Sequence, residues 1–174
     1  MKCLVTADSN WAIGKAGGLL VSIPSDRKMM HNETAGKVIV MGRNSLKNYP
    51  NSLPLAGRTN VILSHNSEFS VRGGIVAHDD DELAEILSQY DSDDIYFVGG
   101  ESVYEKYLPY CDTVIVTKID QIYDADAYFP NLDCDENWQL VAESDEQTYF
   151  SVEYTFREYR NEHPYMLARG VRLC

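Results

Sequence analysis

The sequence lacks the features that mark disulfide-bonded, metal-binding or membrane-spanning proteins. Its four cysteines, Cys3, Cys111, Cys134 and Cys174, are scattered without paired spacing, and its four histidines lack ligand spacing. We therefore expect free thiols in a reducing compartment and no metal site. No run reaches the ~20 apolar residues that cross a membrane. MKCLVTADSN turns polar at Asp8, too early for a signal peptide, so a cytoplasmic location is expected.

Positive charge is scarce and unevenly distributed along the chain, whose net charge is −12. Residues 1–72 hold nine Lys/Arg and four Asp/Glu, a balance of +5, whereas residues 73–174 hold six and twenty-three, a balance of −17. A chain this acidic should not bind nucleic acid, because phosphate binding rests on clustered cations. The basic first part could still bind small anions, although a solvated acidic surface explains the asymmetry equally well.

Apolar runs separated by turn residues predict strands that alternate with helices. Strands are expected at 2–7, 37–42, 60–64, 75–78, 94–100, 112–120, 138–144 and 149–160, and helices at 25–34, 42–50, 78–90 and 101–110. This order predicts an α/β fold of three layers, with a mixed, mostly parallel central sheet flanked by helices and a C-terminal antiparallel hairpin. One domain is expected over residues 1–160. Residues 161–174 form a tail of unknown role, either disordered or packed.

Two predicted strands end in glycine just before a helix. In VIVMGRNS, Gly42 allows a turn, the helix start offers free N–H groups, and Arg43 adds a donor fork suited to phosphate. In YFVGGESVY, Gly99 and Gly100 would let phosphates approach the backbone. Neither segment is a G-x-G-x-x-G motif, and each has a purely conformational explanation. Together they favour a nucleotide ligand with two phosphate regions.

Asp26, in the stretch VSIPSDRKMM, shares a predicted helix face with Met29 and Met30. It could be a simple helix-start acid, which the helix dipole favours by roughly 0.3–1 kcal/mol. Ser25, however, is the better placed cap, and a carboxylate in an apolar site is costly unless it is paired. A lone carboxyl in an apolar pocket can serve proton transfer. Periodicity alone leaves both explanations open.

Three further polar residues are ambiguous when each is taken alone. Arg58, in LAGRTNVILS, is either a surface arginine or a clamp for a substrate carboxylate. Tyr104 and Thr117 lie where core packing or hydroxyl pairing is the ordinary role.

Taken in order, these segments resemble the dihydrofolate reductase family over about residues 2–160. The matching segments are LVTA, NWAIGKAGGLL, IPSD, KVIVMGRNS, LAGRTNVILS, YFVGGESVY followed by YLPYCD, VTKID and DADAYFP. Each segment is a weak signal alone, and the combination is highly specific. The resemblance implies NADPH-dependent reduction of 7,8-dihydrofolate to tetrahydrofolate, with hydride transfer to C6 and protonation of N5, in support of one-carbon metabolism. We expect a monomer.

The resemblance also implies residue roles. Asp26 matches the acid that binds the amino-pyrimidine edge of the pterin and promotes protonation of N5, and Arg58 matches the residue that binds the α-carboxylate of the glutamate tail. The segment from Lys15 to Leu20 matches a mobile loop that closes over the nicotinamide. The expected substrate-binding residues are Val5, Thr6, Asp26, Met30, Leu55, Arg58, Tyr104 and Thr117. The expected NADPH-binding residues are Ala7, Ile13, Gly14, Gly42, Arg43, Asn44, Ser45, Ser64, Gly99, Gly100, Glu101, Ser102, Val103 and Tyr104.

The chain departs from the family pattern in three places. Leu20 and Val21 replace the usual Pro-Trp pair, whose indole helps to hold an ordered water and cover the pterin. Met30 replaces a common aromatic residue, which predicts a softer contact with the benzoyl group. Ser102 stands where some members carry an arginine for the 2′-phosphate. The preference for NADPH then depends on Arg43, assisted by His65 or Arg72.

Two alternatives remain at this stage. A reductase of the same fold could act on another heterocycle, as in riboflavin synthesis, but the presence of both Asp26 and Arg58 argues against it. A binding protein without turnover is the second alternative, and the missing tryptophan is its motivation.

Overall fold

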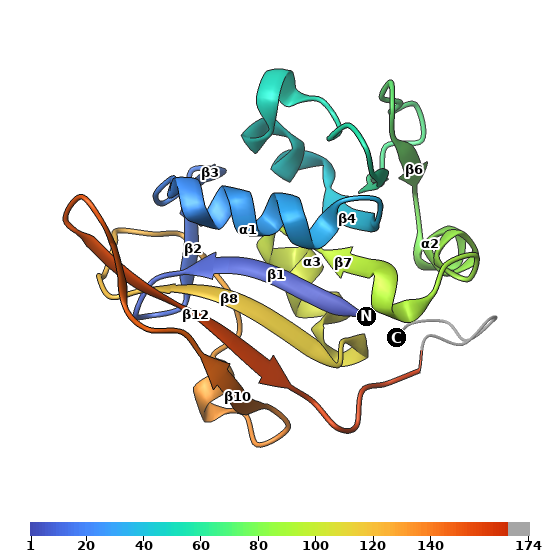
Figure 1. Ribbon diagram of the computed structural model, residues 1–174. Coiled ribbons are helices and arrows are strands. Elements are labelled where there is room, and N and C mark those ends of the chain that lie inside the picture. The colour runs from blue at the N-terminus through green and yellow to red at the C-terminus, as the bar shows by residue number, and fades with distance from the viewer. Residues whose placement is uncertain (167–174) are drawn as a thin grey trace.

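A large central sheet with helices on both faces makes up the computed structural model, which describes residues 1–166 (Figure 1). The strands are β1 Lys2–Ala7, β2 Ala12–Lys15, β3 Gly18–Leu19, β4 Val38–Gly42, β5 Thr59–Leu63, β6 Ile75–Ala77, β7 Ile95–Phe97, β8 Thr113–Ile119, β9 Ala127–Tyr128, β10 Gln139–Glu143, β11 Gln147–Tyr149 and β12 Val152–Arg160. The α-helices are α1 Pro24–Thr34, α2 Asp80–Leu87 and α3 Glu101–Tyr107. Short 3-10 helices are η1 Arg43–Asn48, η2 Pro50–Ser52, η3 Ser92–Asp94, η4 Leu108–Tyr110 and η5 Leu132–Cys134.

The main sheet has the strand order β10-β12-β8-β1-β7-β4-β5-β6, with β11 paired to β12. The strands from β8 to β6 in this order run parallel to one another. The pairs β8–β12, β10–β12 and β11–β12 are antiparallel. The predicted mixed, mostly parallel sheet with a C-terminal antiparallel hairpin at its edge is therefore confirmed.

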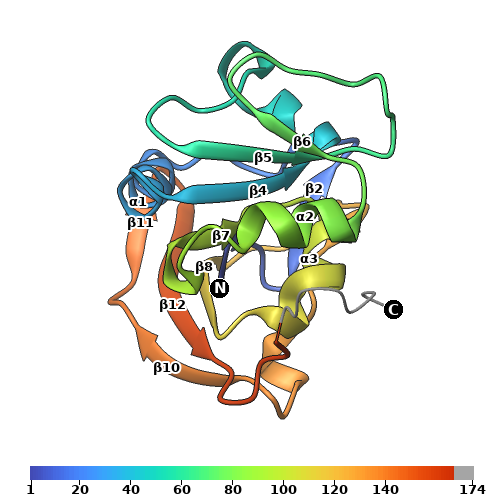
Figure 2. The same ribbon diagram turned by 90° about the vertical axis from the view of Figure 1, so that its right-hand side faces the viewer.

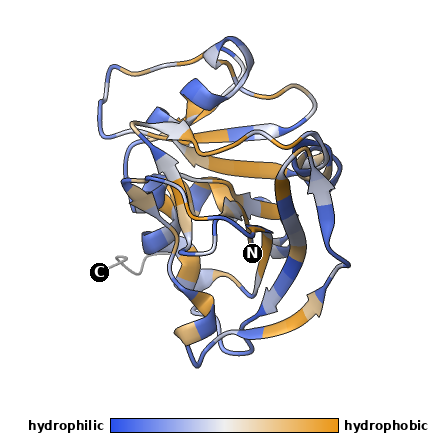
Figure 3. Ribbon diagram, turned by 90° about the vertical axis from the view of Figure 1, so that its left-hand side faces the viewer, coloured by the Kyte–Doolittle hydropathy of each residue, from blue (hydrophilic) through white to orange (hydrophobic). Residues whose placement is uncertain are grey.

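Side chains alternate between the two faces of each central strand and so fill two separate layers. Ile39 belongs to the cluster that packs under α1 and η1, whereas Val38 and Val40 belong to the cluster under α2 and α3. Figure 2 shows α1 on one side of the sheet and α3 on the other. Figure 3 shows that apolar residues concentrate on the central strands. The predicted three layers are confirmed.

The N-terminal third differs from its prediction in two ways. No strand was predicted between residues 8 and 24, but this segment contains β2 and β3, and β2 pairs with both β3 and β9 in a small second sheet. Helix α1 begins at Pro24 rather than at Ser25, and no side chain caps it. The expected cap at Ser25 is therefore wrong, because proline at the first helical position needs no N–H partner and moves the helix start one residue earlier. The Ser25 hydroxyl instead pairs with the Tyr154 hydroxyl.

Two predicted helices are shorter or tighter than expected. The segment 42–50 forms the 3-10 helix η1, since Pro50 disfavours helical geometry at Tyr49 and leaves little room for an α-helix. Helix α2 begins only at Asp80, because Asp79 is its cap and accepts a hydrogen bond from the Glu82 N–H at 2.8 Å.

The start of the C-terminal tail packs against the body of the protein. The Asn161 N–H donates to the Asp112 carbonyl at 2.9 Å, and the Tyr165 N–H donates to the Pro109 carbonyl at 2.8 Å. Residues 167–174, with Cys174, lie outside the described part of the chain. Within residues 1–166 every cysteine is a free thiol, no cluster could hold a metal ion, and no helix is long and apolar enough to cross a membrane.

Candidate active site

A cavity of about 1030 Å³ opens at the carboxyl ends of the parallel strands. This is the edge at which open α/β sheets ordinarily bind ligands. Its walls come from the ends of β1, β4, β5 and β7, from one face of α1, and from the starts of η1 and α3. We call its two halves the carboxylate end, around Thr6 and Asp26, and the glycine end, around Gly42, Gly99 and Gly100.

Two threonines hold the Asp26 carboxylate at the carboxylate end. The Thr117 hydroxyl donates to Oδ1 at 2.5 Å, and the Thr6 hydroxyl donates to Oδ2 at 2.8 Å. Burial raises the pKa of Asp26, and the hydrogen bonds from Thr117 and Thr6 and the charge of Arg27 oppose that rise. The site therefore contains a half-buried carboxyl whose proton is held more tightly than that of an exposed aspartate.

Apolar side chains surround this carboxyl on the helix side. Met29 and Met30 from α1 line the cavity and pack against the cluster that contains Leu4, as the predicted helix face requires. The hydroxyl of Tyr104 on α3 donates to the carbonyl of Leu4, in the middle of β1, at 2.6 Å. The carboxylate end is thus an apolar pocket with one acid.

Val21 does not line the cavity that contains Asp26. Among the described residues that line the cavity, neither Leu20 nor Val21 is present. Val21 is half-buried and packs against the cluster of Ile23, Ile119 and Tyr154. The position of the usual tryptophan is therefore used for core packing.

Arg58 stands at the rim of the cavity, across from the last turns of α1. Its Nε donates to the Thr34 hydroxyl at 2.7 Å, and its terminal nitrogens donate to the carbonyls of Ala56 and His31 at 2.8 and 2.7 Å. A second contact joins Nη2 to Nδ1 of His31 at 3.0 Å. These bonds hold the guanidinium in one orientation, and His31 and Arg27 extend the basic rim.

The glycine end is formed by backbone that comes very close together. The Gly42 N–H donates to the Gly99 carbonyl at 2.8 Å, which joins the turn after β4 to the turn after β7. A Cβ on Gly100 would lie 3.1 Å from the Ser45 hydroxyl oxygen, and a Cβ on Gly42 would lie 3.4 Å from Val103. Gly99 has a φ of +114°, which favours glycine. Side chains are excluded here, so a ligand can approach the backbone.

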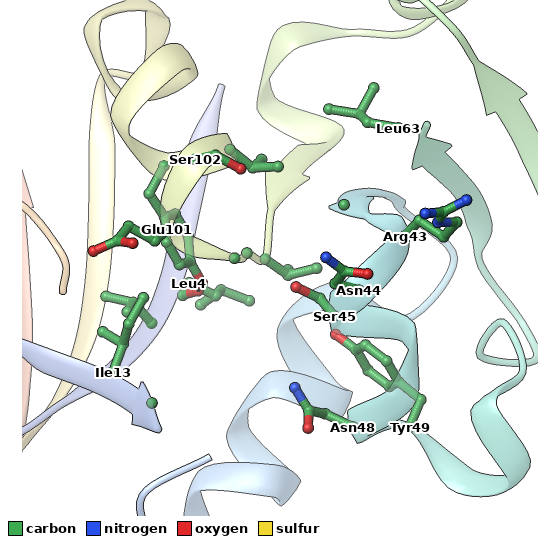
Figure 4. A pocket seen from close by; sticks show the side chains of 18 of the residues that line it. Leu4, Ile13, Arg43, Asn44, Ser45, Asn48, Tyr49, Leu63, Glu101 and Ser102 are labelled. Atoms are coloured by element: carbon green, nitrogen blue, oxygen red, sulfur yellow. Dashed lines mark hydrogen bonds between the residues drawn. The ribbon is translucent and has the colours of Figure 1, made fainter. Parts of the chain in front are cut away.

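Figure 4 shows Arg43, Asn44 and Ser45 on one side of the cavity and Glu101 and Ser102 on the other. Free N–H groups at the start of helical segments and a guanidinium are suited to phosphate oxygens.

Of the two further residues proposed to assist Arg43 at this end, His65 lines the cavity and Arg72 does not. His78, which was not predicted, also lines it, and its Nδ1 lies 2.8 Å from the Ser64 carbonyl.

The small sheet positions the loop that borders both halves. The buried Asp8 carboxylate accepts hydrogen bonds from the Ala12 N–H at 2.9 Å and the Tyr123 N–H at 2.8 Å. Asp126 accepts from the Ala16 N–H at 2.9 Å. Gly17, Gly18 and Leu19 from this loop line the cavity. The loop is therefore tied at its base, while its tip faces the ligand space.

Most of the predicted site residues meet in this one cavity. Two do not line it: Ala7 is buried in the core, and Thr117 is buried behind Asp26, which it contacts. Sequence reasoning missed further wall residues, among them Leu4, Arg27, Met29, His31, Tyr49 and His78. Arg27 and His31 are four residues apart, so the predicted helix places them side by side on one face, which is the signal that could have grouped them.

The two ends of the cavity together define a class of protein. One cavity combines a phosphate-suited glycine end with an apolar end that holds a single acid. This arrangement is that of an α/β enzyme that binds a nucleotide cofactor and a small substrate side by side.

Comparison with known proteins identifies the family within that class. The family model described as "Dihydrofolate reductase" matches residues 1–161. Dihydrofolate reductase of Staphylococcus haemolyticus is 28% identical over 162 residues, which cover 93% of this chain and 89% of that protein. The Bacillus subtilis (strain 168) enzyme is 28% identical over 158 residues, covering 88% and 91%. The chain belongs to the dihydrofolate reductase family.

A solved structure supports the same assignment. Dihydrofolate reductase from Enterococcus faecalis, in complex with NADP(H) and RAB-propyl, is 25% identical in sequence and superposes with a TM-score of 0.79. The match covers 92% of this chain and 95% of that chain. The family expected from the sequence is therefore confirmed, and a riboflavin-type reductase is not favoured.

Proposed function

We propose that this protein reduces 7,8-dihydrofolate to 5,6,7,8-tetrahydrofolate with NADPH and so supports one-carbon metabolism. Membership of the dihydrofolate reductase family supports the reaction. The observation that carries the proposal is the single carboxyl held by two hydroxyls in an apolar pocket, beside a glycine-lined cradle within the same cavity. A buried carboxyl with a raised pKa is typical of proton-transfer sites, which favours an enzyme over a binding protein without turnover.

Asp26 is the catalytic residue of this proposal. Its carboxyl binds the amino-pyrimidine edge of the pterin, whose N–H groups complement carboxylate oxygens, and promotes protonation of N5. Because burial raises its pKa, a larger fraction of Asp26 holds a proton near neutral pH than an exposed aspartate would. The rate of reduction should then fall as the pH rises through the pKa of Asp26.

Arg58 binds the α-carboxylate of the glutamate tail in this proposal. Its guanidinium stands at the rim, held by Thr34 and by carbonyls of Ala56 and His31. A guanidinium fixed in this way loses little freedom when a carboxylate binds. Leu55 and Met30, which line the same cavity as Arg58 and the acid, would contact the benzoyl group.

The residues at the glycine end fit a bound NADPH. Gly42, Gly99 and Gly100 leave the backbone open to phosphates, and Arg43 stands beside them as a cation suited to the 2′-phosphate. A cofactor held by these residues would supply the hydride for C6. Ile13, Gly14 and the loop that follows them would cover the nicotinamide and exclude water.

The remaining expectations are part of the same proposal. Residues 1–160 form the reductase domain, and residues 161–174 are an extension of unknown role. The protein acts as a cytoplasmic monomer, and its acidic charge disfavours nucleic acid.

A steady-state assay tests the proposal directly. The purified chain is mixed with NADPH and dihydrofolate, and the loss of NADPH absorbance is followed. Turnover that requires both reagents is expected. Tight binding of both ligands without turnover would instead indicate a binding protein, and no binding of dihydrofolate would contradict the substrate assignment.

A further inference from the structure

We infer that Thr6 is a positioning residue for Asp26, holding the second carboxylate oxygen at the point where the carboxyl faces the substrate. This inference rests on the proposed function, because it assigns a part of the chain to the control of the catalytic acid. The Thr6 hydroxyl supplies a hydrogen bond to the acid that the Val21 side chain, which has no donor, cannot supply.

The strand register explains how the two threonines act together. Thr6 on β1 and Thr117 on β8 are direct partners on neighbouring parallel strands, so their side chains emerge on the same face of the sheet. Each hydroxyl donates to a different oxygen of Asp26, at 2.8 Å to Oδ2 and 2.5 Å to Oδ1. The carboxylate is therefore held at both oxygens from one side.

The two threonines have different surroundings. Thr117 is fully buried and lies outside the cavity wall. Thr6 is half-buried and lines the cavity beside Asp26. Thr6 is thus the hydroxyl that adjoins the ligand space. A hydroxyl can rotate, so it can donate to an ionised carboxylate or accept from a protonated carboxyl.

No other side chain supplies this contact. Within residues 1–166, the hydrogen bonds to the Asp26 side chain come from Thr6 and Thr117. Val21 has no donor and packs in the separate cluster around Ile23 and Tyr154. Position 21 supplies no hydrogen bond to Asp26. The second carboxylate oxygen is instead bonded by Thr6 on β1.

The test compares Thr6→Val, which removes the hydroxyl at nearly constant volume, with Thr6→Ser, which keeps it. Thr6→Ala is included as a second variant without the hydroxyl, and thermal unfolding checks that each variant folds. The control is Thr155→Val, which removes a hydroxyl bonded to Glu143 at 3.2 Å; Thr155 pairs with Lys118 in the sheet and does not line the cavity. The titration of Asp26 is followed by NMR of its side-chain carboxyl in the free protein, and the pH dependence of hydride transfer is measured in single turnovers.

Losing a donor to a carboxylate favours its neutral form. Thr6→Val and Thr6→Ala are therefore expected to move both midpoints to higher pH by ~1 unit, the usual scale for hydrogen bonds to charged groups. Thr6→Ser and Thr155→Val should keep the wild-type midpoints.

A Thr6→Val titration that superimposes on the wild type would overturn the inference, even if the variant turned over more slowly. The same conclusion would follow if Thr6→Ser shifted as far as Thr6→Val. The proposed function fails in a different way, through absence of NADPH oxidation by the wild-type chain, and the NMR titration in the free protein tests Thr6 in that case too.

Discussion

The two ends of the cavity are built from different parts of the polypeptide. The carboxylate end is made of side chains, with Asp26 held by hydroxyls from two strands. The glycine end is made of backbone, where even a Cβ on Gly100 would come within 3.1 Å of Ser45. The carboxylate end therefore depends on the hydrogen bonds that particular side chains donate. The glycine end depends on the absence of side chains at its glycines.

The largest expected effect concerns the acid itself. Asp26→Asn should lower kcat for dihydrofolate by ~100-fold or more, because general-acid groups ordinarily contribute at least this much. The dissociation constant of NADPH should stay unchanged, because the substitution lies at the carboxylate end and the expected cofactor site is the glycine end. Steady-state kinetics and fluorescence titration measure the two quantities. Asp145→Asn, on the exposed β10–β11 turn, is the matched control. A kcat close to wild type would remove Asp26 from the reaction.

The next largest effect concerns Arg58, which is expected to affect substrate binding and not the chemical step. Arg58→Gln removes a charge-assisted contact worth ~2 kcal/mol, so KM for dihydrofolate should rise ~30-fold. A reduced pteridine without the glutamate tail should react equally well with both proteins. If the variant lost activity on the tail-less pteridine to the same extent, Arg58 would be acting through the structure of α1 rather than through the tail.

A smaller effect is expected at the glycine end. Gly100→Ala places a methyl group against Ser45 and at the approach to the cofactor, so binding of NADPH should weaken ~10-fold, or ~1.4 kcal/mol. Calorimetric titration with NADPH and with a folate analogue tests this. Affinity for the analogue should not change, and an equal loss for both ligands would contradict the division of the cavity into two ends.

The smallest expected effect is on stability. The folded-state pKa of Asp26 is raised above its ordinary value of 3.8 by burial, so the folded chain binds a proton more tightly than the unfolded chain does. The contribution of Asp26 to stability is therefore fully present below the unfolded pKa and is lost as the pH rises through the folded pKa. Each unit of difference costs ~1.4 kcal/mol at neutral pH.

Asp26→Asn removes this titration. The variant should be more stable than the wild type at pH 7, and the difference should shrink as the pH falls towards 4. Denaturant unfolding across this range measures it. A stability difference that does not depend on pH would show that Asp26 titrates normally in the folded chain.

The sequence predicted the framework of the fold because long apolar runs determine buried parallel strands, as in VIVM of β4. It predicted Asp26 on the helix face of Met29 and Met30 because positions three and four apart are neighbours on a helix. It could not predict β2 and β3, which have four and two residues, and β2 in addition pairs with the distant β9. Strands this short carry little periodicity.

The side chains around the acid show a second limit of sequence reasoning. Thr6 and Thr117 are 111 positions apart, and only the register of β1 with β8 brings their hydroxyls to one carboxylate. The direction of Val21 likewise depends on tertiary packing, since it follows the aromatic cluster of Tyr154 on β12. Residue identities gave the candidates, and strand pairing determined which of them meet.

The pH dependence of hydride transfer in single turnovers, compared between the wild type and Asp26→Asn, tests the central claim most directly. The wild-type rate should be constant at low pH and fall tenfold for each pH unit above the pKa of Asp26, whereas the variant should be slow and independent of pH over the same range. A variant that kept the wild-type profile would show that the ionisation belongs to another group, and that the carboxyl held by Thr6 and Thr117 does not control protonation of the substrate.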